Sequence, residues 1–368
     1  MHTDGPRLRA ALVGAGLVGQ AEHAFHLWEE RERFELAAVV DASQTVRLAV
    51  AERYGVPEQG ATLDEVDAAG LDAVVVAVPD AVHRDAVVDA LGRGLHVFCE
   101  KPLALSAEEC DDIEAAAEAS GTVMQVGYMK RHDPAYQYAR ARLPEMPEVS
   151  FIQVNHLHCD NSLHLRDFRV VRFDDLPAGL REAGQAERRQ RVAEALGVAD
   201  LDRVEPIAQR AFGTILGSMI HDIGNLSGFF GPPTRVVSTE LWANGRGINT
   251  VIEYPHDRRA ICSWVDLPEL WEFSETFEVY GSRDRVRVSF PSGFARGMMS
   301  IVNVHGMEAD GRPWRRELVF HDNPFRLELL HFRQCVLEGK QPITPGREAV
   351  ADIKLVADIV RAYLDRRP

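Results

Sequence analysis

Cysteine is scarce and unpatterned in this chain. The 368 residues include five cysteines, no two of them spaced as CxxC: Cys99, Cys110, Cys159, Cys262 and Cys335. An odd and scattered set indicates reduced thiols, and its spacing gives no sign of a disulfide framework or a cysteine-rich zinc site.

Long hydrophobic runs are also missing. The longest, such as Ala73–Pro79, have the length of a strand and fall far short of the roughly 20 residues that cross a bilayer. The opening residues, MHTDGPRLRA, lack the charged and then apolar layout of a secretory signal. We therefore expect a cytoplasmic protein that has no membrane partner.

Positive charge is in deficit. Lysine and arginine number 41 against 56 aspartates and glutamates, so the formal net charge is −15. The basic stretch that stands out, Arg181–Arg191, is interpreted as a solvated part of an insertion. A chain without a basic face is not expected to bind nucleic acid. A nucleotide cofactor remains compatible with this charge, because backbone amides can hold its phosphates.

The first third of the chain alternates strands and helices. Apolar runs that resemble buried strands are followed by segments with helical periodicity. The expected strands are residues 8–13, 35–40, 72–78, 95–99 and 123–126, and the expected helices are about 19–31, 45–54, 81–91 and 107–119. Repeated βα units of this length predict an α/β domain of the Rossmann type, with a doubly wound parallel sheet.

The sequence changes in character after about Glu148. Several segments then alternate apolar and polar residues, as expected for strands of a half-covered, mostly antiparallel open sheet. Residues 176–230 are largely helical in pattern, and two apolar-periodic helices, Arg326–Leu337 and Arg347–Leu364, follow later. We predict a dinucleotide-binding domain over residues 1–130. Residues 131–368 are predicted to form an α+β domain for substrate binding and oligomerisation, with a helical insertion around 160–213.

A glycine-rich turn joins the first strand to the first helix. It reads Gly14-Ala15-Gly16-Leu17-Val18-Gly19. In a dinucleotide fingerprint the first glycine permits the tight turn, the second lets the backbone approach the pyrophosphate, and the third lets helix and strand pack closely. The free amides at the start of the helix then face the phosphates. We expect Gly14, Gly16, Leu17, Val18 and Gly19 to contact the cofactor.

An acidic residue, Asp41, ends the second strand roughly 20 residues after the last glycine, where dinucleotide-binding folds place a ribose-binding acid. Its carboxylate is expected to accept hydrogen bonds from the adenosine ribose and to repel a 2′-phosphate. The next positions, Ala42, Ser43 and Gln44, carry no arginine. The sequence therefore favours NAD over NADP as the cofactor.

Several motifs beyond the glycine turn resemble the Gfo/Idh/MocA oxidoreductase family. The most specific is Glu100-Lys101-Pro102 after the fourth strand. Others are Ala77–His83, Gly94–Leu103, Gln125–Tyr128 with Arg131 and Pro134, Ile220–Ile223, and the pattern from Pro324 to Leu364. Residues from about Asp160 to Gly213 have no counterpart in this resemblance.

The resemblance implies a Rossmann domain followed by an α/β domain whose open sheet builds a homodimer or homotetramer. It implies that Glu100 and Lys101 lie at the nicotinamide end of the cofactor, which agrees with their place after a parallel strand. Val78, Pro79 and His83 are expected to shape the loop beside the cofactor. A partly desolvated lysine in such a crevice is suited to proton exchange near neutral pH.

Oxidising an alcohol needs a group that takes the hydroxyl proton as the hydride leaves. The resemblance nominates His221, with Lys101 as the alternative. Many dehydrogenases of the family carry aspartates four residues before and three residues after this histidine, where this chain has Gly217 and Gly224. Asp222 points about 100° away on a helix and is a poor substitute. A carboxylate from the insertion, Asp167 or Asp174, is an alternative partner for this histidine.

The segment His156-Leu157-His158-Cys159-Asp160 is compatible with three interpretations. His156 and His158 share one face of a strand, so they are compatible with substrate contact, with plain sheet surface, or with a metal. The spacing fits no structural zinc signature, and we expect no metal. Tyr128, Arg131 and His158 are predicted substrate contacts, whereas Trp264 and Trp271 are predicted to serve packing.

Taken together, the sequence predicts an NAD-dependent oxidoreductase that moves a hydride to or from a secondary alcohol of a sugar or cyclitol. Two other functions stay open. One is a lyase or glycosidase that retains NAD for transient oxidation. The other is a cofactor-binding sensor or assembly subunit, which would bind NAD without turning over a polyol.

Overall fold

The computed structural model describes residues 5–166, 168–172 and 175–366, and they form two compact units. The first unit draws its described residues from 1–128, 168–195 and 325–350, and the second from 129–167, 196–324 and 351–368. The sequence predicted two continuous domains with a boundary at residue 130. The compact units follow contacts, so two later segments pack with the first unit.

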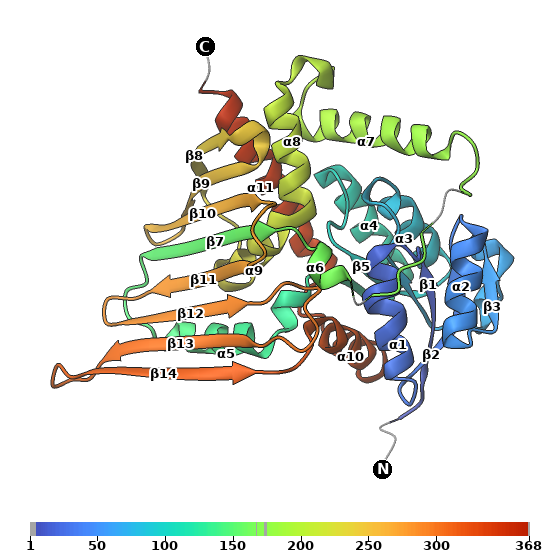
Figure 1. Cartoon of the computed structure of the whole chain (residues 1–368), viewed down its shortest axis with the longest axis horizontal. Coiled ribbons are helices and arrows are strands. Elements are labelled where there is room, and N and C mark those ends of the chain that lie inside the picture. Colours follow the sequence, from blue (N-terminus) through green and yellow to red (C-terminus); the bar gives the residue numbers. More distant parts are fainter. Residues whose placement is uncertain (1–4, 167, 173–174, 367–368) are drawn as a thin grey trace. The chain divides into compact units, whose positions relative to one another are not determined.

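A six-stranded parallel sheet forms the centre of the first unit, in the order β3-β2-β1-β4-β5-β6 (Figure 1). Its strands are β1 (Leu8–Val13), β2 (Phe34–Val40), β3 (Glu58–Gly60), β4 (Ala73–Val76), β5 (His96–Glu100) and β6 (Met124–Gly127). Chain order reverses between β1 and β4, which makes that point the topological switch where ligands of such sheets bind. The predicted Rossmann fold is confirmed, although β3 was not predicted.

Helices of the first unit follow the strands as the periodicity indicated. They are α1 (Ala24–Glu29), α2 (Gln44–Tyr54), α3 (His83–Gly92), α4 (Ala107–Ser120) and, from later in the chain, α10 (Pro324–Glu338). Local signals set their ends: Ser106 and Glu109 form a capping box at α4, and Gly55 ends α2 in the left-handed region. Leu329 and Phe332 of α10 join the core that β1 and β2 build.

The predicted insertion contributes α7 (Leu180–Leu196). Two of its arginines make ion pairs with the N-terminal part of the first unit. Arg188 contacts Asp80 at 3.2 Å, and Arg191 contacts Glu109 at 3.3 Å. The charged stretch that the sequence assigned to a solvated surface therefore also carries specific contacts.

An eight-stranded sheet dominates the second unit, in the order β14-β13-β12-β11-β7-β10-β9-β8 (Figure 1). Its strands are β7 (Phe151–Cys159), β8 (Arg235–Trp242), β9 (Gly247–Tyr254), β10 (Arg258–Leu267), β11 (Ser274–Tyr280), β12 (Asp284–Phe290), β13 (Ser300–Met307) and β14 (Pro313–Phe320). The β7–β10 pair is parallel and the other pairs are antiparallel. The predicted mostly antiparallel sheet is confirmed, and β13 and β14 extend it beyond the predicted strands.

Two helices of the second unit contact this sheet: α5 (Pro134–Arg142) contacts β12 to β14, and α8 (Pro206–Thr214) contacts β8. The unit also contains α6 (Ser162–Leu165) and α9 (Ile220–Phe230). A last helix, α11 (Gly346–Leu364), divides its residues between the two units. Among the described residues, no helix is both long and apolar enough to cross a bilayer.

Candidate functional site

The glycine turn after β1 has the shape that a phosphate cradle needs. Gly14 has φ +91°, and a Cβ there would lie 2.5 Å from the amide nitrogen of Val78. A Cβ on Gly19 would lie 2.4 Å from the carbonyl oxygen of Gly14, whereas a Cβ on Gly16 would meet no atom within 4 Å. The turn is therefore closed against the residues that follow β4 and open at Gly16, which fits a dinucleotide pyrophosphate.

The helix that follows the glycine turn begins with a π-helical turn, η1 (Gly19–His23), before α1. Leu17 and Val18 are half-buried where the turn enters this helix. A π-helical turn accommodates an extra residue in a helix and is frequent at functional sites. Here it ends on His23, whose side chain reaches the strand-end glutamate described below.

The Asp41 side chain is fixed beside the glycine turn. Its Oδ2 accepts a hydrogen bond from the amide of Ala15 at 2.8 Å, and its Oδ1 accepts one from the amide of Ser43 at 2.8 Å. Arg47, one helical turn into α2, donates to the Asp41 carbonyl oxygen at 3.1 Å and to Gln59 Oε1 at 2.6 Å. A cation thus lies near Asp41, although none of the three residues after Asp41 is basic.

The carboxyl ends of β1, β2, β4 and β5 carry the other predicted cofactor contacts. Because parallel strands end at one edge of a sheet, the glycine turn, Asp41, Val78 with Pro79, and Glu100 with Lys101 share that edge. His83 bridges two of these loops: its ring nitrogens lie 2.7 Å from the Pro102 oxygen and 2.8 Å from the Val78 oxygen. Burial lowers the pKa of His83, so the neutral ring donates a hydrogen bond to one of these two oxygens.

Glu100 is buried and paired. Its Oε1 lies 2.7 Å from Nε2 of His23, and its Oε2 accepts a hydrogen bond from the amide of Lys101 at 3.1 Å. Burial alone would raise the pKa of Glu100, but the hydrogen bond and charge of His23, together with Lys101, lower it below the ordinary value. Glu100 is therefore ionised at neutral pH, next to the lysine of the predicted site.

A second glutamate, Glu328 of α10, lies fully buried near Glu100. Burial, followed by the charges of Glu100 and Glu22, raises the pKa of Glu328 well above its ordinary value. Like charges in a low-dielectric site cannot all ionise. Glu100 is thus charged and paired with His23, while burial and the nearby Glu100 charge favour the protonated form of Glu328.

The predicted substrate residues are divided between the two units. Lys101 and the buried Tyr128 belong to the first unit, whereas Arg131, His158 and His221 belong to the second. Arg131 is buried against α9, because a Cβ on Gly228 would lie 2.8 Å from its Nε. The predicted roles of these residues in substrate binding stay predictions.

A buried polar cluster occupies the inner part of the second unit. His156 Nδ1 lies 2.9 Å from Asp222 Oδ2 and 3.6 Å from Glu275 Oε2, and the Lys130 ammonium contacts Glu275. Burial lowers the pKa of His156 to about 4, and burial raises the pKa of Asp222 to about 6. At pH 7 the neutral His156 ring therefore donates a hydrogen bond from its Nδ1–H group to the Asp222 carboxylate.

His156, Asp222 and Glu275 are also grouped closely enough to hold a metal ion, since their ligand atoms lie within 4.8 Å of one another. The Lys130 ammonium, however, already supplies a positive charge to Glu275. A divalent cation would have to coexist with that ammonium or displace it. The geometry therefore favours a hydrogen-bonded cluster.

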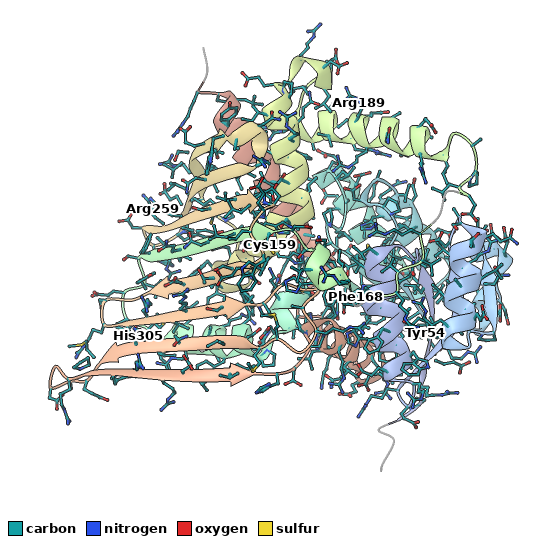
Figure 2. All side chains as sticks on the ribbon, in the orientation of Figure 1. Tyr54, Cys159, Phe168, Arg189, Arg259 and His305 are labelled. Carbon is teal, nitrogen blue, oxygen red and sulfur yellow. The ribbon has the colours of Figure 1, made fainter. Side chains whose placement is uncertain are left out.

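A hollow of about 460 Å³ opens beside this cluster, lined by residues of the second unit alone: His158, Cys159, Asp160, Asn161, Thr214, Gly217, Ser218, Trp264, Asp266 and Pro268. Cys159, labelled in Figure 2, ends β7. The rings of His158 and Trp264 stack with centroids 5.5 Å apart. Apolar ring faces beside hydroxyl, amide and carboxylate groups form a surface suited to a polyol.

His221 is the second residue of α9, which directly follows a second π-helical turn, η8 (Ile215–Met219). A spacing of four residues brings two side chains together in an α-helix, and the π-helical turn changes that relation. The Asp222 carboxylate contacts His156. Asp167 and Asp174, considered as partners, lie outside the described residues.

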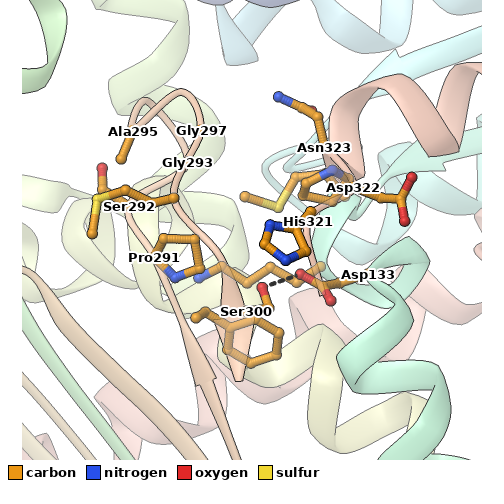
Figure 3. A pocket seen from close by; sticks show the side chains of 15 residues that line it. Asp133, Pro291, Ser292, Gly293, Ala295, Gly297, Ser300, His321, Asp322 and Asn323 are labelled. Carbon is orange, nitrogen blue, oxygen red and sulfur yellow. Dashed lines mark hydrogen bonds between the residues drawn. The ribbon is translucent and has the colours of Figure 1, made fainter. Parts of the chain in front are cut away.

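Another cavity of the second unit is shown in Figure 3. Asp133, Ser292, Ser300, His321 and Asp322 are among its lining residues, and Ser300 donates a hydrogen bond to Asp133. Its volume of about 40 Å³ suffices for a few water molecules. A sugar ring does not fit, so this cavity is not the polyol site.

Sequence reasoning missed several of these polar residues. His23 was not singled out because a histidine inside a helical pattern carries no signal of its own partner. Lys130 and Glu275 gave no motif, since their contact joins positions far apart in the chain. His156 was considered only with His158, although its closest carboxylate is Asp222.

Residues 8–128 match the profile of an oxidoreductase family with an NAD-binding Rossmann fold. A similar protein is scyllo-inositol 2-dehydrogenase (NAD+) from Bacillus subtilis, which is 33% identical over 138 residues. That match covers 37% of this chain and 40% of the relative. The chain therefore matches less than half the length of this curated relative.

Solved structures resemble the whole chain in fold. A protein described as an NADPH-dependent oxidoreductase from Desulfitobacterium hafniense has a TM-score of 0.76 at 16% identity, covering 99% of this chain and 97% of that one. A 3-ketoreductase from Actinomadura kijaniata in complex with NADP has a TM-score of 0.69 at 17% identity, covering 97% and 98%. At such identities the likeness concerns the fold.

Proposed function

We propose that this protein, whose residues 8–128 match the model of the Gfo/Idh/MocA oxidoreductase family, transfers a hydride between NAD and a secondary alcohol or ketone of a sugar or cyclitol. One observation carries the proposal most directly. The glycine turn, open at Gly16, follows β1 at the topological switch of the parallel sheet, and the Glu100-Lys101 pair lies at the same edge of the sheet, at the end of β5.

The cofactor supplies the hydride acceptor or donor when it is bound. The turn kept tight by Gly14 and Gly19 would let the backbone at Gly16 approach its pyrophosphate. Asp41 would accept hydrogen bonds from its ribose. The Lys101 ammonium or amine exchanges the hydroxyl proton, and the ionised Glu100 beside it keeps negative charge near that lysine. His221 binds the substrate hydroxyl or shares the proton transfer.

The substrate is a free polyol in this proposal. Among the described residues that line the hollow beside Trp264 there is no lysine or arginine, while Asp160 and Asp266 are present. A diphosphate group would find no cationic partner on this surface and would be repelled. Hydroxyl groups find Asn161, Ser218 and Thr214 as hydrogen-bond partners.

The proposal is tested on protein stripped of nucleotide. Calorimetry measures NAD+ binding, and absorbance of NADH follows oxidation of inositols, free hexoses and a UDP-hexose. We expect NAD+ binding and NADH formation with a free polyol. Failure to bind either pyridine nucleotide would refute the cofactor site. Binding without turnover of any polyol would support the sensor alternative.

A further inference from the structure

An aspartate from the insertion lies at the adenosine end of the predicted cofactor site. Asp175 accepts hydrogen bonds from the Ser43 hydroxyl at 2.6 Å, from the Thr45 amide at 3.0 Å and from the Thr45 hydroxyl at 2.8 Å. All three residues belong to the first unit. The donation from Ser43, the largest cause, lowers the pKa of Asp175, so this carboxyl is ionised at neutral pH.

These donors form the anion-binding end of α2. Ser43 is the N-cap of this 11-residue helix, and its oxygen also accepts a hydrogen bond from the Val46 amide. The first amides of a helix attract anions, because they lack partners within the helix and lie at its positive end. In this protein an acidic side chain of the chain itself takes that position.

The same donors follow the ribose-binding acid directly. Asp41 accepts a hydrogen bond from the Ser43 amide. The Ser43 and Thr45 side chains come two and four positions after Asp41 in the sequence. Folds of this type distinguish the two cofactors here, because NADP carries a phosphate where NAD has the 2′-hydroxyl of that ribose. A 2′-phosphate therefore needs donors or cations in this segment.

We propose that Asp175 is a specificity-determining residue: its carboxylate occupies the donors at the start of α2 and, together with Asp41, excludes the 2′-phosphate of NADP. This inference rests on the proposed function, since it concerns the same cofactor site. It assigns a role to an insertion that the resemblance leaves without a counterpart.

A second contact holds the insertion in this place. The Gln20 side chain donates to the Val171 carbonyl oxygen at 3.0 Å and accepts from the Val171 amide at 2.8 Å. Gln20 directly follows the last glycine of the cradle. The insertion is thus bonded on both sides of the cofactor site, to the glycine-turn helix and to α2.

Arg47 is the cation that would favour a 2′-phosphate if the Asp175 carboxylate were absent. Its guanidinium is bonded to Gln59 and to the Asp41 carbonyl oxygen, close to the Asp175 partners in sequence. Removing the Asp175 charge leaves this cation and the freed donors to meet a 2′-phosphate. The substitution is therefore expected to admit NADP and to leave NAD binding intact.

The test measures dissociation constants by calorimetry, on protein stripped of nucleotide, for NAD+ and NADP+. It compares the wild type, Asp175→Asn, Asp175→Ala and the control Asp112→Asn, which removes an exposed carboxylate of α4 that pairs with Arg84. Thermal melting without nucleotide checks that each variant is folded. Measurements at low and high salt show which changes in affinity are electrostatic, because salt screens exposed charges.

We expect the wild type to bind NAD+ more tightly than NADP+. Both Asp175 variants should bind NADP+ about tenfold more tightly, as removal of one nearby charge implies, with NAD+ affinity within about twofold. The control should match the wild type. Equal changes for both nucleotides, or no change for NADP+, would overturn the role of Asp175 alone. A wild type that binds neither nucleotide would overturn the proposed function as well.

Discussion

Side chains of the candidate site act through partners that fix their charge and direction. Asp41 is held by two backbone amides, and Glu100 is held by His23 and by the Lys101 amide. Buried charges are tolerated only when they are paired in this way. The chemistry expected of Lys101 thus depends on a histidine from the helix after the glycine turn.

Lys101→Ala tests the proposed proton exchange. We expect kcat to fall by about 10²- to 10⁴-fold, the usual contribution of a general acid or base, with NAD+ affinity nearly unchanged. Steady-state kinetics and calorimetry on the same samples check this. Lys340→Ala is the control, because Lys340 is an exposed first-unit lysine that pairs with Glu338. A kcat within twofold of wild type would contradict the role of Lys101.

His23→Gln tests the pairing with Glu100. Loss of the imidazole removes the hydrogen bond and charge that lower the pKa of Glu100, so this pKa should rise. We expect the acidic limb of the kcat/KM profile to move to higher pH. His26→Gln is the matched control, since His26 is a neighbouring buried histidine that contacts Glu22 and Glu29. An identical shift in both variants would argue for a merely structural effect.

At the scale of elements, two π-helical turns lie next to site histidines, of which the sequence predicted only His221. One follows the glycine turn and ends on His23, and the other, Ile215–Met219, ends two positions before His221. The glycine turn itself depends on packing against the residues that follow β4, as Gly14 and Gly19 show. The conformation of the glycine turn therefore depends on these tertiary contacts as well as on the helical pattern of the sequence.

Two glycine variants separate folding from cofactor binding. Gly19→Ala places a Cβ 2.4 Å from a backbone oxygen, so we expect a loss of roughly 1–3 kcal/mol in the free energy of unfolding. Gly16→Ala meets no atom within 4 Å and should unfold like the wild type, yet bind NAD+ more weakly. Urea denaturation without nucleotide and calorimetry measure the two effects. Wild-type NAD+ affinity in Gly16→Ala would contradict the cradle.

At the scale of the whole molecule, each unit carries its own buried polar cluster. The first contains Glu100, His23 and Glu328, and the second contains Lys130, His156, Asp222 and Glu275. Such clusters make stability depend on pH, because burial shifts the pKa of each group relative to the unfolded chain. The predicted homodimer or homotetramer through the second-unit sheet stays a prediction, which light scattering after size exclusion tests.

Asp222→Asn tests the pH dependence of the second unit. Burial raises the pKa of Asp222 from 3.8 to about 6, so its contribution to stability is full below 3.8 and is lost as pH rises through about 6. His156 acts oppositely: its contribution is full above 6.5 and is lost as pH falls through about 4.

The variant removes only the Asp222 titration. Relative to wild type, Asp222→Asn should therefore gain about 1–2 kcal/mol in the free energy of unfolding between pH 5 and about pH 7.5. Urea denaturation at several pH values measures this difference, and Asp257→Asn, an exposed position paired with Arg259, serves as control. A difference that stays constant with pH would contradict the raised pKa of Asp222.

Local patterns sufficed for much of the fold and of the cofactor site. Alternating apolar runs and helical periods predicted the parallel sheet, and the spacing from the glycine turn to Asp41 placed both at one sheet edge. These features depend on neighbours in sequence, because a turn, a cap or a strand is specified within a few residues. The strands β3, β13 and β14 were not predicted.

The sequence by itself determined the glycine turn, the strand-end acids and the strand-end lysine. Tertiary structure alone decided which distant side chains meet: His23 with Glu100, Lys130 with Glu275, and Asp175 with the start of α2. A side chain's partner across the fold leaves no local trace, because hydrogen bonds and ion pairs depend on distances that exist only after the elements have packed.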